Sequence, residues 1–229
     1  AKYVDHVIVP SHHFAKKLQD QGVTKPLTVL SNGLEESVLQ SLTMSKPRKY
    51  TSEEKLKIMW CGRMSPEKRP LEFLKAIRQL SNVEVDMYGD SIAMNSVKRY
   101  IRRYKLHGVV TLHGSVPQKA VLEAMKTHHV FVSSSYDFDN QPMVLLEAVA
   151  TGLPVVYCDP DLGEVIPAKG SIVTESPDAA GLVKAFKHLQ ANPTLVGRMS
   201  KAMLAARVNT AQVSHLDQLV DIYTSILRK

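Results

Sequence analysis

Two cations lie where a predicted strand passes into a predicted helix. Arg63 and Lys68 flank the loop that follows Gly62, and Pro70 falls in the first turn of the next helix. Free N–H groups and a partial positive charge at a helix N-terminus favour an anion. With both side chains added, the loop is suited to a diphosphate. The spacing is not that of a P-loop, and a purely structural role for surface cations at a helix start stays open.

Two carboxylates lie near a second helix start, in DNQPMVLLEAVATG. Pro142 stands where a first helical residue would, and Gly152 where the helix would stop. Glu147 is the one charged residue of this apolar helix, and Asp139 lies in the loop that opens it. A buried carboxylate is costly unless it meets a polar partner. The pair predicts a site for the hydroxyls of a sugar; the structural alternative is a Glu147 held by a neighbouring Arg or backbone N–H.

The elements around these residues alternate between short apolar runs, such as VFV and PVVY, and helical periods. Continuous apolar runs are typical of parallel strands covered on both faces. Repeated β-α-β units predict an α/β fold with a doubly wound parallel sheet, which binds ligands at the carboxyl ends of its strands. The expected strands are 6–10, 27–30, 56–61, 83–88, 109–112, 129–133, 153–157 and 171–174, and the expected helices between them are 70–80, 91–104, 117–126 and 142–150.

The chain divides into four segments by composition. Residues 1–40 hold a strand, a helix and a strand, too few to bury a core of their own. Residues 41–55 are polar and aperiodic, as expected of a linker. The β/α pattern fills most of 56–209, where Met199, Met203 and Leu204 fit the buried stripe of a helix. Residues 210–229 predict an amphipathic helix with an apolar stripe of Val213, Leu216, Leu219, Val220 and Tyr223.

Composition excludes several classes of protein. The 44% hydrophobic content excludes a disordered tail, and no apolar run is long enough to cross a bilayer. The net charge of +7 is partly due to residues 98–105, whose cations share one helix face. We interpret this face as solvated, with an anionic membrane surface or a phosphate-bearing substrate as the alternatives. With only 6% aromatics and no nucleic-acid motif, nucleic acid is not expected as a partner.

Cysteine and histidine usage points to a protein without a disulfide or a metal. Cys61 and Cys158 fall in apolar runs, which favours free thiols in a reducing cytoplasm. The first residues do not resemble a signal peptide. The histidine pairs at 12–13 and 128–129 lack further ligands at metal-site spacing, and a serine-hydrolase elbow is absent.

Five segments, in this order and spacing, carry a family resemblance: AKYVDHVIVPS, VLSNGL, CGRMSPEKRPLEFLKAI, VVTLHGSV and DNQPMVLLEAVATGLPVV. Together they resemble the retaining glycosyltransferases of family 4, which have the GT-B fold of two Rossmann-like domains. The resemblance implies that this chain is the C-terminal, donor-binding domain with a small remnant of the N-terminal acceptor domain. The final helix resembles the one that crosses back to that missing domain.

The resemblance also implies roles for the charged residues. Arg63 and Lys68 match the pair that binds the donor diphosphate and stabilises the leaving nucleotide without a metal. Glu147 matches the carboxylate that binds the ribose. Asp139 stands at the place of a glutamate that faces the transferred sugar, so its reach is shorter by one methylene. Arg69 replaces a common glycine and adds a third candidate phosphate contact.

Backbone groups complete the implied site. Gly62 lies beside the diphosphate, and the Gly114, Ser115 and Val116 turn lies beside the nucleobase. The loop of Asn140, Gln141, Pro142 and Met143 offers N–H groups to sugar hydroxyls, although proline has none. Ser91 replaces the second glycine of a usual Gly-x-Gly, which is expected to crowd or reshape the nucleotide loop.

The sequence therefore predicts a donor-binding domain that transfers a hexosyl group from a nucleotide diphosphate sugar, UDP rather than GDP, and that is inactive on its own. By resemblance, the protein is bacterial, acts in cell-envelope or polysaccharide synthesis, and works in the cytoplasm or at the inner face of the membrane. The alternatives are a GT-B-like epimerase or phosphorylase, against which the order of the motifs argues, and a non-catalytic nucleotide-binding or membrane-docking module.

Overall fold

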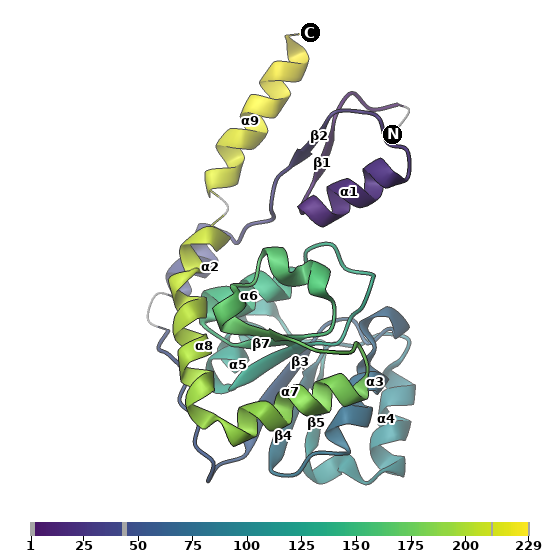
Figure 1. Cartoon of the computed structure of the whole chain (residues 1–229), viewed down its shortest axis with the longest axis vertical. Coiled ribbons are helices and arrows are strands. Elements are labelled where there is room, and N and C mark those ends of the chain that lie inside the picture. The colour runs from purple at the N-terminus through teal and green to yellow at the C-terminus, as the bar shows by residue number, and fades with distance from the viewer. Residues whose placement is uncertain (1–2, 43–44, 212, 229) are drawn as a thin grey trace.

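The computed structural model describes residues 3–42, 45–211 and 213–228. Figure 1 shows a layered α/β body below a smaller assembly made from both ends of the chain. Within the described ranges, every helix is too short or too polar to cross a lipid bilayer.

The body is built on a six-stranded, all-parallel sheet with the order β5-β4-β3-β6-β7-β8. Its strands are β3 (Leu56–Cys61), β4 (Val83–Tyr88), β5 (Val110–Gly114), β6 (Val130–Ser133), β7 (Val155–Tyr157) and β8 (Ser171–Val173). The order reverses between β3 and β6, which is the topological switch point where doubly wound sheets bind ligands. The predicted doubly wound sheet is confirmed, with strand ends shifted by a few residues at most.

Helices cover both faces of this sheet. They are α3 (Pro70–Ile77), α4 (Met94–Arg103), α5 (Gln118–Thr127), α6 (Met143–Thr151), α7 (Ala179–Ala191) and α8 (Pro193–Ala205). Alternate residues of one strand face opposite layers: Ile58 and Trp60 pack with α3, α4 and α7, whereas Met59 packs with α5 and α6. Burial on both faces explains why the strands read as continuous apolar runs. Short 3-10 turns cover Pro66–Lys68, Leu106–Gly108, Pro160–Glu164, Ala168–Gly170 and Arg207–Thr210.

The smaller assembly contains β1 (Val7–Val9), α1 (His12–Asp20), β2 (Leu27–Val29) and α9 (Val213–Leu227). Helix α2 (Glu36–Ser41) lies against the body, where Val38 and Leu39 pack on the core between α5 and α6 (Figure 1). β1 and β2 pair in parallel, and α9 stands beside them (Figure 1). The chain crosses between the two parts twice at one place, where Leu34 N–H donates to Thr210 O at 2.8 Å. The strand-helix-strand fragment is confirmed, and α2 was not predicted.

The stripe of α9 is exposed. Leu216, Val220 and Tyr223 are each at least half exposed, and Leu219 is half-buried; the side chain of Val213 lies outside the described residues. Tyr3 and Val4, beside the two-stranded sheet, are exposed as well. The amphipathic helix is therefore confirmed, with its apolar stripe largely uncovered.

The predicted linker is not loosely held. In its described part, Arg48 is buried and donates from its guanidinium to the backbone oxygens of Met125, His128 and Thr151 at 2.8 to 3.1 Å. Those oxygens lie at the ends of α5 and α6, where helix carbonyls have no intrahelical partner. The segment is thus a strap tied to the body, although it contains no regular element in 45–55.

Candidate active site

The carboxyl ends of β3, β4 and β5 meet at one edge of the sheet. Gly62 N–H donates to Tyr88 O at 3.1 Å, and Gly89 N–H donates to Gly114 O at 2.7 Å. Gly89 has φ of 120°, and a Cβ there would lie 1.9 Å from Gly62 O. Only glycine fits this approach. The exposed Ser91 follows it, with its N–H donating to Asp90 Oδ1 at 2.7 Å.

Met64 anchors the loop after β3 through backbone bonds. Its N–H donates to Asp90 O at 3.2 Å, and its carbonyl accepts from Ala93 N–H at 2.8 Å, while its side chain is fully buried. The adjacent Arg63 side chain points to solvent, 67% exposed, with Nη2 3.5 Å from Glu67 Oε1. Such an exposed pair contributes little to stability and leaves the guanidinium available.

Lys68 lies deeper, at the switch point. Its Nζ is 2.5 Å from Asp139 Oδ1, and the two side chains are 18% and 11% exposed. Asp139 Oδ2 is buried and has no hydrogen-bond partner among the described residues. Ser134 fixes the backbone here, since its Oγ donates to Lys68 O at 2.7 Å and accepts from Trp60 Nε1 at 3.0 Å.

Lys68 and Asp139 line a small cavity of about 20 Å³ together with Pro142 and the ends of β3 and β6. This is room for about one water molecule. Asp139 thus lines this cavity and has one carboxylate oxygen without a partner among the described residues. A buried acceptor without a partner is unfavourable, and a ligand hydroxyl would satisfy it.

Glu147 is buried in the middle of α6 and is near enough to Cys61, which lines the cavity, to affect its ionisation. Its Oε1 accepts from Gln118 Nε2 at 2.6 Å. Burial raises the pKa of Glu147, and the hydrogen bond from Gln118 opposes this rise. Burial also raises the pKa of Cys61, which lines the cavity, to about 12, with a further contribution from the charge of Glu147. The sequence alternative gave Glu147 a neighbouring Arg or a backbone N–H as its partner, whereas the structure shows the Gln118 side chain in that place.

The other predicted site residues lie in the loops before α5 and α6. Ser115 is exposed and Val116 is half-buried, just before α5 brings Gln118 to Glu147. Asn140 and Met143 are exposed. Helix α6 begins at Met143, one residue later than predicted, so Pro142 directly precedes the helix. Gly152 ends the helix with φ of 74°, as predicted.

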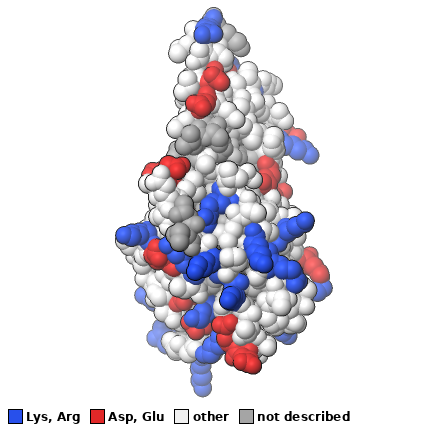
Figure 2. All heavy atoms as spheres, turned by 90° about the vertical axis from the view of Figure 1, so that its left-hand side faces the viewer, with Lys and Arg blue, Asp and Glu red and all other residues white. Residues whose placement is uncertain are grey.

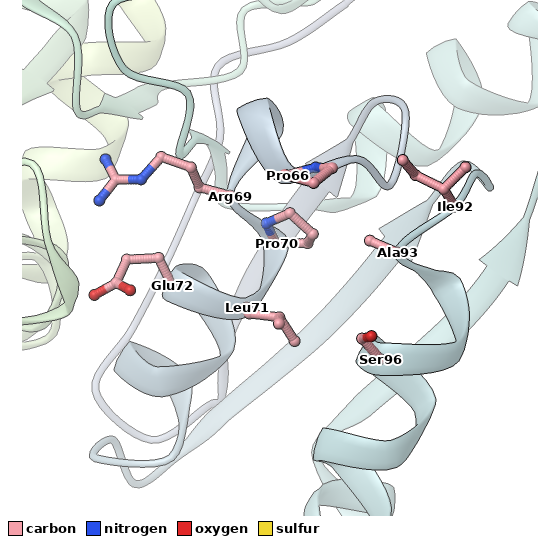
Figure 3. A pocket seen from close by; sticks show the side chains of 8 residues that line it. All are labelled: Pro66, Arg69, Pro70, Leu71, Glu72, Ile92, Ala93 and Ser96. Carbon is pink, nitrogen blue, oxygen red and sulfur yellow. The ribbon is translucent and has the colours of Figure 1, made fainter.

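Arg69 directly precedes α3 and is half-buried. It has φ of 53°, its Nη1 is buried without a hydrogen-bond partner among the described residues, and its guanidinium carbon lies 6.0 Å from the ring centre of Tyr136. Figure 3 shows Arg69 and Glu72 extending to the same side of α3. A phosphate contact by Arg69 stays a prediction.

A second cavity, of about 390 Å³, lies between the starts of α3 and α4 (Figure 3). It contains none of Lys68, Asp139 and Glu147, and we assign it no chemistry. Its lining is mostly apolar and comprises Pro66, Arg69, Pro70, Leu71, Glu72, Ile92, Ala93 and Ser96.

Positive charge also gathers away from the crevice. Figure 2 shows Lys and Arg over the body on the side along which α8 runs. The cations of α4, Lys98, Arg99, Arg102 and Arg103, are all exposed, as the solvated-face interpretation requires. Among the residues that the structure describes, no group of three or more His, Cys, Asp or Glu could hold a metal ion.

Sequence reasoning missed Gln118, Ser134 and the side chain of Gln141. Gln141 is buried and bonds to the N-terminal segment, which no local pattern indicates. Gln118 stands at the first residue of a helix, and a polar side chain there was the available signal. Ser134 follows β6 directly and acts through its hydroxyl.

Doubly wound, Rossmann-like sheets bind their ligands at the topological switch point, where this domain has its cations and carboxylates. The family profile described as Glycosyl transferases group 1 matches residues 55–192, more than half of the chain. The chain therefore belongs to the group 1 glycosyl transferases, with the fold of a GT-B C-terminal domain. No curated protein sequence matches it.

Solved structures share the fold at low identity. A glycosyltransferase from Rickettsia africae has 17% identity and a TM-score of 0.82, over 98% of this chain and 64% of that one. Anabaena Alr3699/HepE in complex with UDP-glucose has 17% identity and a TM-score of 0.81, over 97% and 64%. A point mutant of S. aureus TarM, in complex with UDP among other ligands, has 17% identity and a TM-score of 0.80, over 97% and 44%. The chain thus spans less than two thirds of each of these proteins.

Proposed function

We propose that this chain is the donor-binding part of a retaining glycosyltransferase that uses a nucleotide diphosphate sugar, UDP rather than GDP. The observation that carries the proposal is the Lys68–Asp139 pair at the switch point, with one carboxylate oxygen buried and unpartnered among the described residues. The complexes of HepE with UDP-glucose and of TarM with UDP support the choice of UDP.

The cations would act on the diphosphate. Lys68 is held near the cavity, and Arg63 is exposed in the same loop, so it can turn toward a ligand without breaking a buried contact. Negative charge builds on the diphosphate as the bond to the sugar breaks, and fixed cations stabilise that charge more in the transition state than before it. No metal is needed for this step in the proposal.

The carboxylates would hold the two sugars. Glu147 would accept hydrogen bonds from the ribose hydroxyls. For this, the Gln118 amide would have to share or release Glu147 Oε1. Asp139 would accept from a hydroxyl of the transferred sugar through Oδ2, and the N–H groups of Asn140, Gln141 and Met143 would donate to others. The nucleobase would lie against the backbone of Gly114 to Val116, and Gly62 would lie beside the phosphates.

The acceptor would be bound by an N-terminal domain outside this chain. The exposed apolar side chains of α9 and of the β1–β2 region offer a surface on which that domain would pack. The chain alone would then turn over little substrate. We also predict a bacterial source, work in the cytoplasm or at the anionic inner face of the membrane, and a role in the synthesis of envelope polymers.

Isothermal titration calorimetry with UDP, UDP-glucose and uridine tests the proposal. We expect UDP and UDP-glucose to bind much more tightly than uridine, because the diphosphate supplies the contacts with Arg63 and Lys68. Equal affinities for UDP and uridine would contradict the phosphate role. No heat with any of them, together with tight binding to anionic liposomes, would favour the docking module, for which the exposed cations of α4 are the supporting observation. Retention is tested separately by the anomeric configuration of a product made with the N-terminal domain present.

A further inference from the structure

In the loop that carries Asp139, residues 137, 139 and 141 each make a hydrogen bond or an ion pair to another part of the chain, and we call each of these contacts a tie. Asp137 N–H donates to Asp159 Oδ2 at 2.8 Å, Asp139 pairs with Lys68, and Gln141 bonds to the N-terminal segment. The first two ties lead into the six-stranded body. The third leads to the loops that follow β1 and β2, so the position of this loop depends on a different part of the chain.

Gln141 uses its whole side-chain amide in this tie. Its Nε2 donates to Pro10 O and to Ser31 Oγ, both at 2.9 Å. Its Oε1 accepts from Asn32 N–H at 2.5 Å, and its backbone oxygen accepts from Asn32 Nδ2 at 3.3 Å. The residue is 7% exposed. Four hydrogen bonds around one buried residue fix its direction, since leaving any of its groups unpaired would be costly.

The rest of the loop has little packing of its own. Tyr136 and Phe138 are about half exposed, and Asp137 has φ of 49°, which is unfavourable for a residue other than glycine. Among the described residues, this loop also contacts the N-terminal segment through an ion pair between Lys17 and Asp137, whose side chains are both exposed and whose contribution is small. Gln141 is therefore the buried anchor on this side of Asp139.

We propose that Gln141 is a positioning residue, which holds Asp139 at the donor sugar by tying its loop to the strand ends of β1 and β2. The inference rests on the proposed function. It means that the N-terminal segment takes part in donor binding through Ser31, Asn32 and Pro10, with Gln141 as the connection. By linkage, donor binding would in turn strengthen the contact between the two parts of the chain.

The structure offers a matched control for this role. Glu164 joins the same two parts, because its carboxylate accepts from the N–H groups of His12 and His13 at 2.8 and 2.7 Å. It lies in the loop after β7 and outside the loop that carries Asp139. Glu164→Ala therefore cuts hydrogen bonds between the two parts without releasing that loop.

The experiment compares Gln141→Ala with Glu164→Ala in the whole chain, by calorimetry with UDP-glucose and UDP. We expect Gln141→Ala to weaken UDP-glucose about tenfold, or roughly 1.4 kcal/mol. UDP should lose less, since Asp139 would face the sugar. Glu164→Ala should change both affinities by less than about twofold, well within that difference. Equal losses in the two variants would overturn the positioning role and leave Gln141 as one more tie between the parts.

Amide hydrogen exchange of the ligand-free chain gives a readout that needs no donor. Gln141→Ala should speed exchange across residues 137–141, and Glu164→Ala should not. Unchanged exchange in 137–141 would overturn the inference whether or not UDP binds. Absence of UDP binding by the unmodified chain, with faster exchange in Gln141→Ala, would instead contradict only the proposed function.

Asn32→Ala supplies a milder break in the same network. It removes the bond from Nδ2 to Gln141 O and keeps the backbone N–H. We expect a smaller change in the same direction. The double variant should lose more than Gln141→Ala alone, because the backbone oxygen of residue 141 remains an acceptor there, but less than the sum of the two, because both act in one network. Additive losses would contradict a shared route.

Discussion

The two ion pairs at the crevice each join a cation to a carboxylate and differ in burial. Lys68 and Asp139 are 18% and 11% exposed and 2.5 Å apart, whereas Arg63 and Glu67 are 67% and 25% exposed and 3.5 Å apart. In the inner pair each charge depends on the other for stabilisation, because little water reaches it. In the rim pair water can solvate each charge if the other is removed. We therefore expect substitutions in the inner pair to change both stability and binding, and substitutions at the rim to change binding alone.

Lys68→Ala has the largest expected effect. It leaves Asp139, whose side chain is 11% exposed, without its cation. Breaking a fully buried pair costs about 3–5 kcal/mol, and we expect a loss below that range because this pair is only partly buried. It also removes a contact to the diphosphate, so UDP should bind at least about tenfold more weakly, since hydrogen bonds to charged groups contribute about 1.5–3 kcal/mol. Urea denaturation and calorimetry measure the two effects.

A second substitution separates these effects. Adding Asp139→Asn to Lys68→Ala should restore much of the stability and none of the UDP affinity, because it neutralises the stranded carboxylate without replacing the cation. Lys75→Ala is the matched control, since Lys75 pairs with Glu72 on the exposed side of α3. Recovery of UDP binding in the double variant would contradict the phosphate role of Lys68.

Glu147→Gln comes next, and it tests the other buried carboxylate. We expect UDP to bind about tenfold more weakly through the lost charge-assisted bonds to the ribose, while the fold is retained. Calorimetry with UDP and circular dichroism measure these properties. Global unfolding of this near-isosteric variant would instead favour a purely structural role for Glu147.

The pH dependence of stability sharpens the same point. Burial raises the pKa of Glu147 above its ordinary value of 4.5. Between the unfolded and the raised folded pKa the native state binds more protons, so this group's contribution to stability is present below pH 4.5 and falls as the pH rises through the folded pKa. Urea midpoints of Glu147→Gln relative to the unmodified chain should increase with pH across this window. A constant difference would contradict the raised pKa.

Arg63→Ala has the smallest expected effect. Its exposed pair with Glu67 contributes little to stability, so the urea midpoint should hardly move. UDP should bind several-fold more weakly and uridine should be unaffected, as calorimetry with both ligands would show. A loss of stability as large as in Lys68→Ala would remove the distinction between the inner pair and the rim.

Local sequence patterns located most of the fold because they report local physics. The apolar runs at 56–61 and 129–133 marked β3 and β6, whose two faces are both buried, and Gly152 marked the end of α6. The helix α2 was missed because its six residues show no clear period. Arg48 lies in the segment predicted as a polar linker, because nothing nearby in sequence shows that three helix-end carbonyls lie around it.

The amino-acid sequence determined which charged groups are available: two cations after one strand, and two carboxylates, one just before a helix and one on it. It also determined the order of elements that makes a parallel sheet. Tertiary structure alone decided which of these groups are buried and with whom. It placed Lys68 against Asp139, Gln118 against Glu147, and Gln141 against the loops after β1 and β2. These pairs join residues 29 to 131 positions apart, so their distances are fixed by packing of the sheet and its helices, which no short stretch of sequence encodes.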